Sequence, residues 1–243
     1  MKYANEKKYL LKRFISFLIT IVCLGGIVYS SINIYLWKKS IDNNENVQKS
    51  IDKMIKTTNN DGIKVDFNSL KKENSDTVGY LVVKNTSIKY VVVKGNNNSF
   101  YLDHNFNKEK NVAGWIFMDY KNTNLKEDKN TVIYGHNMKD GSMFGTLKNT
   151  LKSEWPNNKI IYITEKETLK YEVFSTYIVN EEEYYIQTNF NSLEDYDMFL
   201  NKIKSRSNKN YKVNVTSEDN ILTLSSCAGY GNKRVVLHAK LIK

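Results

Sequence analysis

Cysteine, proline and glycine are scarce in this chain of 243 residues. It contains two Cys, one Pro and eleven Gly. So few prolines and glycines exclude collagen-like and proline-rich architectures, and two cysteines cannot form the network of a disulfide scaffold. Hydrophobic residues make up 41% of the sequence and charged residues 26%. We therefore expect a globular fold whose stability comes from core packing.

The positive charge is distributed unevenly along the chain. Of the net charge of +10, the first 39 residues contribute +6, since they hold seven Lys or Arg and one Glu. The remaining residues carry 29 basic and 25 acidic side chains. A nucleic-acid-binding surface requires basic residues concentrated on one face, and no such run occurs beyond the N-terminus. We therefore predict that nucleic acid is not a partner.

A run of 24 residues without a charge, residues 14–37, predicts a membrane span. A helix of this length covers about 36 Å, enough for a hydrocarbon core of roughly 30 Å. A cleavable signal peptide has a shorter apolar run and a small-x-small cleavage site, which Ser30-Ser31-Ile32 does not provide. The run is therefore interpreted as an uncleaved signal anchor. Five basic residues precede it and two follow it directly, which predicts a cytoplasmic N-terminus and an extracellular remainder.

Four segments are expected along the chain: a basic cytoplasmic segment 1–13, a transmembrane anchor 14–37, a helical lead-in 38–75 and a β-rich domain 76–243. In the lead-in, the apolar residues Val47, Ile51, Met54 and Ile55 occur at helical spacing, which predicts a helix. Asp66 is expected to cap a second short helix that extends through Leu70.

From residue 77 the pattern changes to short runs typical of β-strands, separated by turn-forming residues. Many short strands without regular helix alternation predict an antiparallel barrel or sandwich rather than a parallel α/β sheet. Two helical segments are expected among them: 143–152, and 192–205 with a cap at Ser192. The apolar residues on one side of the longer helix are Leu193, Tyr196, Phe199, Leu200 and Ile203. The predicted strands are 78–83, 88–93, 113–118, 131–134, 159–163, 169–179, 211–215, 221–224 and 234–242.

Cys227 is the only cysteine outside the membrane span. It has no partner within the exported region, so it is either an intermolecular bridge or a free thiol kept for its reactivity. With one cysteine, and with His104, His136 and His238 outside any HExxH motif, the sequence offers no tetrahedral zinc set. We expect no metal site and no cofactor. His238 lies in an alternating strand and is interpreted as structural, and His104 lies in a loop and is interpreted as a surface residue.

His136, Cys227 and Arg234 stand at the ends of predicted strands, where a rigid support can hold catalytic groups. A turn of about six residues joins the last two strands, so Cys227 and Arg234 are expected side by side. A free thiol, with an ordinary pKa near 8.5, is only about a few per cent thiolate at neutral pH, and nearby cations raise that fraction. Acyl transfer through a thioester uses such a group, with His136 as the acid that protonates the leaving amine and Arg234 as a fixed positive charge.

The sequence Tyr134-Gly135-His136-Asn137 is followed about ninety residues later by Thr223-Leu224-Ser225-Ser226-Cys227, and then by Arg234 on the next strand. This pattern resembles the sortases, which are membrane-anchored cysteine transpeptidases of Gram-positive bacteria. The resemblance covers about residues 45–243, and the lead-in and the helix at 192–205 are similar to class B. It implies a mainly β fold, a closed eight-stranded barrel with N-terminal helices and a helix inserted before the last strands.

The resemblance also implies site residues. His136, Cys227 and Arg234 correspond to the catalytic residues. Residues of the sorting-signal groove correspond to Asn98, Leu102, Tyr134, Tyr185, Ile186 and Ser225. Class B relatives often carry an acidic residue just after the cysteine, where this chain has Ala228-Gly229-Tyr230. A triad that depends on a carboxylate at that place is therefore not expected, which favours Arg234 as the third member.

The resulting hypothesis is a cell-membrane enzyme with an extracellular catalytic domain. It cleaves the C-terminal sorting signal of a surface protein through a cysteine thioester and transfers the acyl group to an amine of a peptidoglycan precursor or cross-bridge. Two alternatives stay open. One is a surface cysteine endopeptidase that uses water, although no papain-like Cys-Gly-Ser-Cys run is present. The other is a noncatalytic surface binding domain in which Cys227 is a buried apolar residue.

Overall fold

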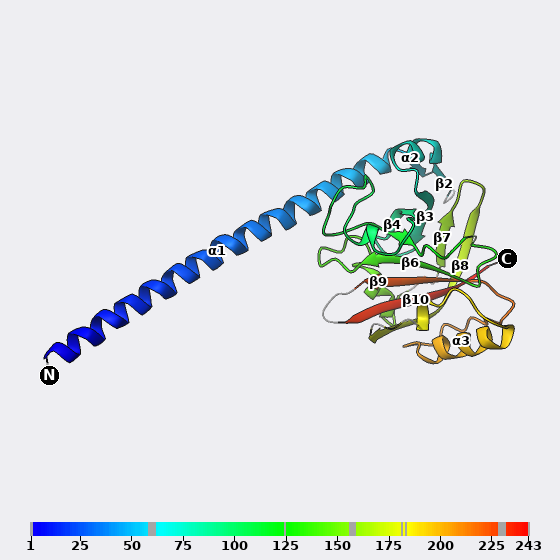
Figure 1. The fold of residues 1–243 in the computed structure, drawn as a ribbon. Coiled ribbons are helices and arrows are strands. Elements are labelled where there is room, and N and C mark those ends of the chain that lie inside the picture. The colour runs from blue at the N-terminus through cyan, green and yellow to red at the C-terminus, as the bar shows by residue number, and fades with distance from the viewer. Residues whose placement is uncertain are drawn as a thin grey trace. The chain divides into compact units, whose positions relative to one another are not determined.

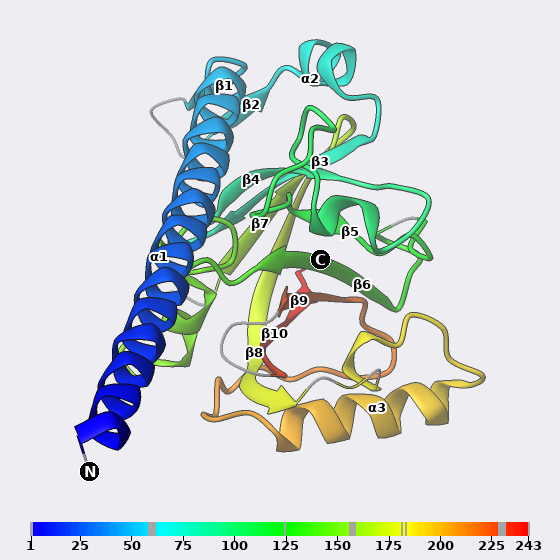
Figure 2. The same ribbon diagram turned by 60° about the vertical axis from the view of Figure 1, so that its left-hand side comes forward.

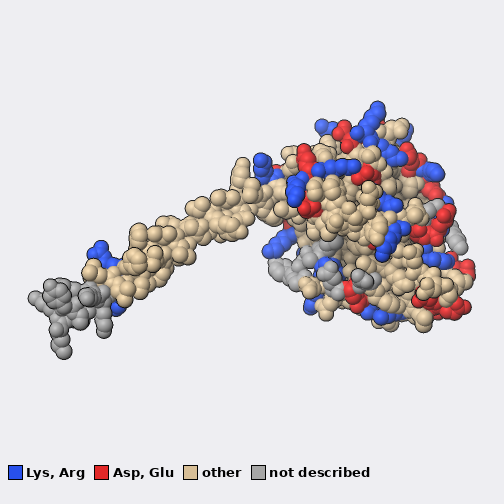
Figure 3. Space-filling model, viewed as in Figure 1, with Lys and Arg blue, Asp and Glu red and all other residues tan. Residues whose placement is uncertain are grey.

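The computed structural model describes residues 2–57, 62–123, 125–155, 159–180, 182, 184–227 and 232–242, and for residues 2–8 and 227 it describes the backbone. The chain forms two compact units, residues 1–43 and 44–243. Lys and Arg are interspersed with Asp and Glu over the face of the second unit in Figure 3, so this face carries no field of a single sign.

One long helix, α1 (Lys2–Asp52), contains the apolar run (Figure 1). The large apolar side chains of this run are exposed, among them Phe14 at 59% and Ile27 at 62%. By length and composition this helix is a candidate membrane span. An apolar surface that contacts no protein is what a lipid-facing helix presents.

The last turns of α1 belong to the second unit. Val47 and Ile51 are buried in its core, and Asn44 donates a hydrogen bond of 3.1 Å to the carbonyl of Gly114. The prediction that Met54 and Ile55 continue the helix is wrong. The helix ends at Asp52, and Ile55 opens strand β1 (Ile55–Thr57), whose backbone pairs with β2 (Ile63–Val65).

Helix α2 (Phe67–Glu73) follows, and its cap confirms the role expected for Asp66. The Asp66 carboxylate accepts a hydrogen bond of 3.1 Å from the backbone N–H of Ser69. This bond to the charged form is the main reason that the pKa of Asp66 lies below its ordinary value. The cap therefore favours the ionised carboxylate at the start of the helix.

Eight strands close into a barrel in the order β10-β8-β7-β3-β4-β5-β6-β9 (Figures 1 and 2). The predicted closed eight-stranded barrel is confirmed. The barrel is not wholly antiparallel, however, because β4 with β5 and β6 with β9 run parallel. The strands are β3 (Thr77–Val83), β4 (Lys89–Val93), β5 (Phe117–Met118), β6 (Asn130–His136), β7 (Lys159–Ile163), β8 (Thr168–Asn180), β9 (Ile221–Cys227) and β10 (Lys233–Leu241).

Helix α3 (Leu193–Ser205) lies below β10 in Figure 1. Its buried side chains pack against residues of β8 and β10, and its predicted cap is present, since Ser192 Oγ accepts from the N–H of Asp195 at 3.1 Å. Leu193 was expected on the buried side but is 49% exposed, because the first helical residue faces away from the barrel. The buried face consists of Tyr196, Phe199, Leu200 and Ile203.

Three predicted elements are wrong in type or extent. Residues 211–215 form no strand, because every barrel strand already has two neighbours and Lys212 has a positive φ of 57°. Of residues 113–118 only β5 is a strand, since Gly114 adopts a φ of 54°. Within 143–152 the structure forms a 3₁₀ helix, η2 (Leu147–Leu151), and Met143, with a φ of 51°, lies outside it.

Candidate active site

The ends of β6 and β9 lie side by side. These strands pair in parallel, with Tyr134 opposite Ser225 and His136 opposite Cys227. Successive residues of a strand point to opposite faces, so Tyr134 and His136 share one face and Gly135 occupies the other. A Cβ on Gly135 would lie 2.3 Å from Ile116 Cδ1 and 2.9 Å from Phe144 Cγ. Gly135 therefore faces the packed core, and Tyr134 and His136 face away from that contact.

Strand β10 brings Arg234 to the same end of the barrel. It pairs antiparallel with β9, with Val236 opposite Ser225, and this register continued by two residues brings Arg234 opposite Cys227. On its other side Arg234 pairs with Val179 of β8. The backbones of His136, Cys227 and Arg234 thus meet on three neighbouring strands, as the expected turn between β9 and β10 requires. Ala228, Gly229 and Tyr230 in that turn lie outside the described residues.

The imidazole of His136 is held by a backbone carbonyl. Its Nε2 lies 2.7 Å from the carbonyl oxygen of Leu102, the last residue of the short 3₁₀ helix η1 (Phe100–Leu102). A carbonyl oxygen only accepts, so Nε2 carries the hydrogen, and Nδ1 is the ring nitrogen that this bond does not engage. Leu102 was expected to line the sorting-signal groove. The contact of its carbonyl with the imidazole is a role that the sequence did not indicate.

Asn98 and Tyr134 meet at one carboxylate. Asn98 Nδ2 and the Tyr134 hydroxyl donate to the same oxygen, Oδ2 of Asp119, at 2.8 Å and 2.7 Å. Asp119 is buried, with 3% of its surface exposed. Sequence reasoning missed this residue, because an Asp before a turn carries no signal that distinguishes it from an ordinary turn former.

The other predicted groove residues lie beside β9. The hydroxyl of Tyr185, in the 3₁₀ helix η3 (Tyr184–Ile186), lies 3.1 Å from Ser225 Oγ. Both residues are buried, and Ile186 is partly buried against the core. Ser225 pairs with Tyr134, so the two groups of predicted groove residues meet at the β6–β9 pair. This pair lies two positions before His136 and Cys227 in the strand register.

His238 and His104 have environments of a different kind. His238 is fully buried, its Nε2 lies 2.8 Å from the Tyr177 hydroxyl, and its Nδ1 lies 2.8 Å from Thr223 Oγ1. Burial, with a contribution from the charge of Arg206, lowers the pKa of His238 from 6.5 to about 3. His104 stacks on Phe100 at 4.0 Å between ring centroids. Both imidazoles therefore have contacts typical of structural histidines.

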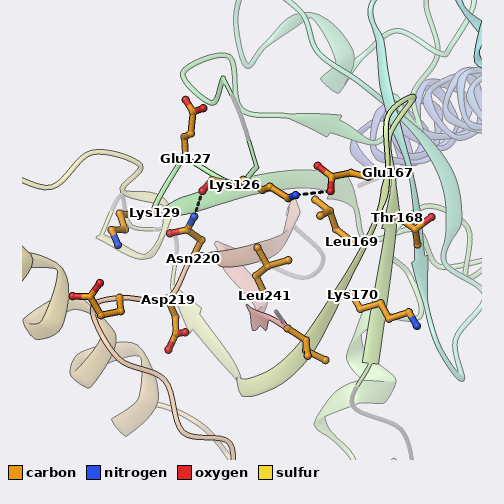
Figure 4. A pocket seen from close by; sticks show the side chains of 12 residues that line it. Lys126, Glu127, Lys129, Glu167, Thr168, Leu169, Lys170, Asp219, Asn220 and Leu241 are labelled. Atoms are coloured by element: carbon orange, nitrogen blue, oxygen red, sulfur yellow. Dashed lines mark hydrogen bonds and ion pairs between the residues drawn. The ribbon is translucent and has the colours of Figure 1, made fainter.

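A hollow of about 730 Å³ opens at the other end of β9 (Figure 4). An ion pair of 2.6 Å joins Lys126 and Glu167 across it, and Asn220 Nδ2 donates to the carbonyl of Lys126. Asn220 precedes the first residue of β9, and Cys227 is the last. Seven strand residues cover roughly 20 Å, so this hollow is separate from the meeting point of His136, Cys227 and Arg234.

Comparison with known proteins identifies the class. The model of the sortase domain matches residues 81–242. Sortase B of Listeria monocytogenes is 36% identical over 247 residues, which cover 96% of this chain and 98% of the relative. Sortase B of Staphylococcus aureus is 35% identical over 243 residues, with the same coverage. The chain therefore belongs to the sortase family, whose members are cysteine transpeptidases, and the resemblance inferred from the motifs is confirmed.

Solved structures point to the same branch of the family. The crystal structure of sortase B from Bacillus anthracis aligns with a TM-score of 0.74 and 36% identity, covering 84% of this chain and 99% of that one. The Staphylococcus aureus sortase B–substrate complex aligns with a TM-score of 0.70 and 32% identity, covering 85% and 94%. A further sortase B, with 38% identity and a TM-score of 0.69, was solved in complex with triglycine and covers 73% and 85%. The chain is thus an enzyme similar to sortase B.

Proposed function

We propose that this enzyme cleaves a C-terminal sorting signal through a thioester on Cys227 and transfers the acyl group to an amine of a cell-wall peptide. The observation that carries the proposal is the strand register, with His136 opposite Cys227 and Arg234 reached by continuing the β9–β10 pairing. The sortase B relatives solved with a substrate and with triglycine support the same pair of reactants.

In the acylation step the thiolate of Cys227 forms a bond to a backbone carbonyl carbon of the sorting signal. The oxygen of the tetrahedral intermediate becomes negative, and the guanidinium of Arg234, which stays charged, stabilises it. The C–N bond then breaks, and the departing nitrogen takes a proton from Nδ1 of His136. During this transfer the Nε2–H of His136 keeps its bond to the carbonyl of Leu102, which holds the imidazole in place.

In the transfer step an amine of the cell-wall peptide attacks the thioester carbonyl. Its nitrogen gives a proton back to His136, the C–S bond breaks, and Cys227 leaves as a thiolate. Water competes with the amine at every cell surface. Transfer is faster than hydrolysis only when the enzyme holds the amine in attacking geometry, because an oriented reactant has a high effective concentration.

The proposal includes a location. The apolar run of α1 anchors the protein in the cell membrane with its N-terminus in the cytoplasm, since five basic residues lie before the run and two directly after it. Residues 38–243 then lie on the outer side, with the catalytic barrel in residues 76–243. Sorting signals and cell-wall amines are accessible there.

The full chain in detergent tests the reaction. A peptide library is incubated with the enzyme, with and without triglycine, and the products are identified by mass spectrometry. We expect peptides joined to triglycine and a Cys227 thioester in the trapped enzyme. Because the chain holds two thiols, the trapping is repeated in a Cys23→Ser variant, in which Cys227 is the only cysteine.

Three outcomes separate the alternatives. Cleavage that never yields the triglycine product indicates a cysteine endopeptidase. No cleavage, together with a Cys227 that iodoacetamide does not label at neutral pH, indicates a binding domain. Turnover that persists in Cys227→Ala contradicts the proposal directly.

A further inference from the structure

Asp119 lies at the start of the turn that follows β5. Its backbone N–H donates to the carbonyl of Val132 on β6 at 2.9 Å, which ties it to the strand that carries Tyr134 and His136. Its carboxylate accepts three hydrogen bonds. Two of them reach Oδ2, from Asn98 Nδ2 and the Tyr134 hydroxyl, and the third reaches Oδ1 from the backbone N–H of Lys121 at 2.9 Å.

The residue that follows Asp119 holds the other end of the Asn98 side-chain amide. Asn98 Oδ1 accepts from the backbone N–H of Tyr120, the residue after Asp119, at 3.0 Å. The amide is therefore fixed at both ends by two consecutive residues. Asn98 lies just before η1. The last residue of η1, Leu102, contacts the His136 imidazole through its backbone carbonyl. Segment 98–102 thus contacts β6 and its flanking turn at two places, the Asp119 carboxylate and the His136 imidazole.

We propose that Asp119 is a positioning residue that fixes Asn98 and Tyr134 relative to each other as one wall of the sorting-signal groove. The inference rests on the proposed function, because it assigns Asp119 an effect on that substrate. Asp119 is buried and acts through its two partners. Its loss should therefore weaken the binding of the peptide and leave the reacting groups His136, Cys227 and Arg234 in place.

The substitution Asp119→Asn isolates this role. Asparagine has the same shape but replaces one acceptor oxygen with an NH₂ donor. Its one remaining oxygen cannot accept from Asn98 Nδ2, the Tyr134 hydroxyl and the Lys121 N–H together. At least one partner loses a charge-assisted hydrogen bond. We expect the KM for the peptide to rise about tenfold, with kcat within about twofold of the wild type.

A matched variant controls for damage to the turn. Asp128 lies in the same connection between β5 and β6, and its carboxylate accepts from Asn122 Nδ2, from the backbone N–H of Thr123 and from Thr123 Oγ1. Asp128→Asn removes a comparable acceptor from the same connection. We expect its KM to match that of the wild type. The thermal unfolding midpoints of both variants are measured to confirm that each is folded.

A double variant tests whether Asp119 acts through Tyr134. Tyr134→Phe removes the hydroxyl bond and keeps the ring on Phe117, whose centroid lies 5.1 Å away. Once the hydroxyl is absent, Asp119→Asn should raise KM by less than in the wild type. The inference would be overturned if the two substitutions raised KM independently, so that their factors multiply in the double variant. It would also be overturned if Asp119→Asn left KM unchanged, or if Asp128→Asn raised KM as much as Asp119→Asn does. A fall in kcat without a change in KM would overturn it as well.

Binding without turnover separates this inference from the proposed function. In a Cys227→Ala background, the dissociation constant of the most strongly retained library peptide is compared with and without Asp119→Asn. If the dissociation constant rises about tenfold, and the enzyme never joins peptides to triglycine, the role of Asp119 is upheld and transpeptidation is rejected. If the enzyme joins peptides to triglycine efficiently, and Asp119→Asn changes neither KM nor the dissociation constant, transpeptidation is upheld and the inference about Asp119 is rejected.

Discussion

Gly135 separates the two β6 side chains that face the candidate active site. Its missing side chain allows Ile116 and the ring of Phe144 to pack directly on the strand. The motif Tyr-Gly-His was recognised from the sequence through its resemblance to a family. The steric reason for the glycine is visible only in the packed barrel, because Ile116 and Phe144 come from other segments.

Gly135→Ala is expected to destabilise the protein by about 1–3 kcal/mol, the usual cost of overpacking a core. The added Cβ pushes on Ile116 and on the Phe144 ring, so it should also displace His136 and lower kcat. Urea unfolding and peptide turnover measure the two effects. The control is Gly95→Ala, whose Cβ would meet its neighbours at 3.5 Å or more. Equal stability of the two variants would contradict the expectation.

The burial of His238 leads us to expect that the folded protein loses stability in acid. Its pKa is about 3 in the folded protein and 6.5 in the unfolded chain, so between these values only the unfolded state binds the proton. Stability is therefore complete above about pH 6.5 and decreases as the pH falls toward 3. At pH 5 this single group should account for a loss of about 2 kcal/mol.

Urea unfolding of His238→Gln at pH 7.5 and pH 5 checks this value. The variant should be less stable than the wild type at pH 7.5, because the bonds to Tyr177 and Thr223 are disturbed. Its loss of stability between the two pH values should be smaller by about 2 kcal/mol. An unchanged pH dependence would show that His238 takes up no extra proton on unfolding.

Helix α3 is the element that the sequence predicted best. The cap at Ser192 and the apolar period through Ile203 are local signals, because both depend on residues within one helix. Strand β9 shows the opposite case. Its β character follows from its residues, whereas its parallel partner β6 lies about ninety residues earlier in the chain.

Ser192→Ala should destabilise the protein by about 1 kcal/mol, because the N–H of Asp195 loses its acceptor. Ser205→Ala is the matched control at the other end of α3, where an exposed hydroxyl donates only to the carbonyl of Lys202. Its effect should stay within about 0.5 kcal/mol. Thermal unfolding of the two variants compares them, and a larger loss in Ser205→Ala would contradict the assigned cap.

At the scale of the whole molecule, the end of α1 belongs to the second unit, residues 44–243. Val47 and Ile51 are buried in the core of residues 44–243, and Asn44 bonds to Gly114. The apolar residues before them are exposed. One continuous helix therefore combines a candidate membrane span with a part of the catalytic unit.

Truncation separates these two roles. Residues 44–243 expressed alone should be soluble without detergent and should keep the turnover of the full chain, because the exposed apolar run is removed. Residues 54–243 should be less stable by roughly 3–5 kcal/mol, since Val47 and Ile51 no longer cover the core. Denaturant unfolding compares the two fragments. Equal stability would show that the last turns of α1 contribute little to the fold.

The sequence by itself determined the features that depend on neighbouring residues or on composition. These are the uncharged run of α1, the cap and apolar face of α3, the β character of the strands and the motifs around His136 and Cys227. Each follows from short-range geometry, in which periodicity and capping act within a few residues. The family resemblance supplied the closed barrel, which the residues alone left open against a sandwich.

Only the tertiary structure decided which distant segments meet. The parallel pairing of β6 with β9 brings His136 to Cys227, and the burial of Asp119 joins Asn98 to Tyr134. Closure of the barrel also leaves residues 211–215 without a strand to pair with, despite their alternating pattern. These contacts depend on hydrogen bonds and packing between segments far apart in the chain, and no local pattern encodes such partners.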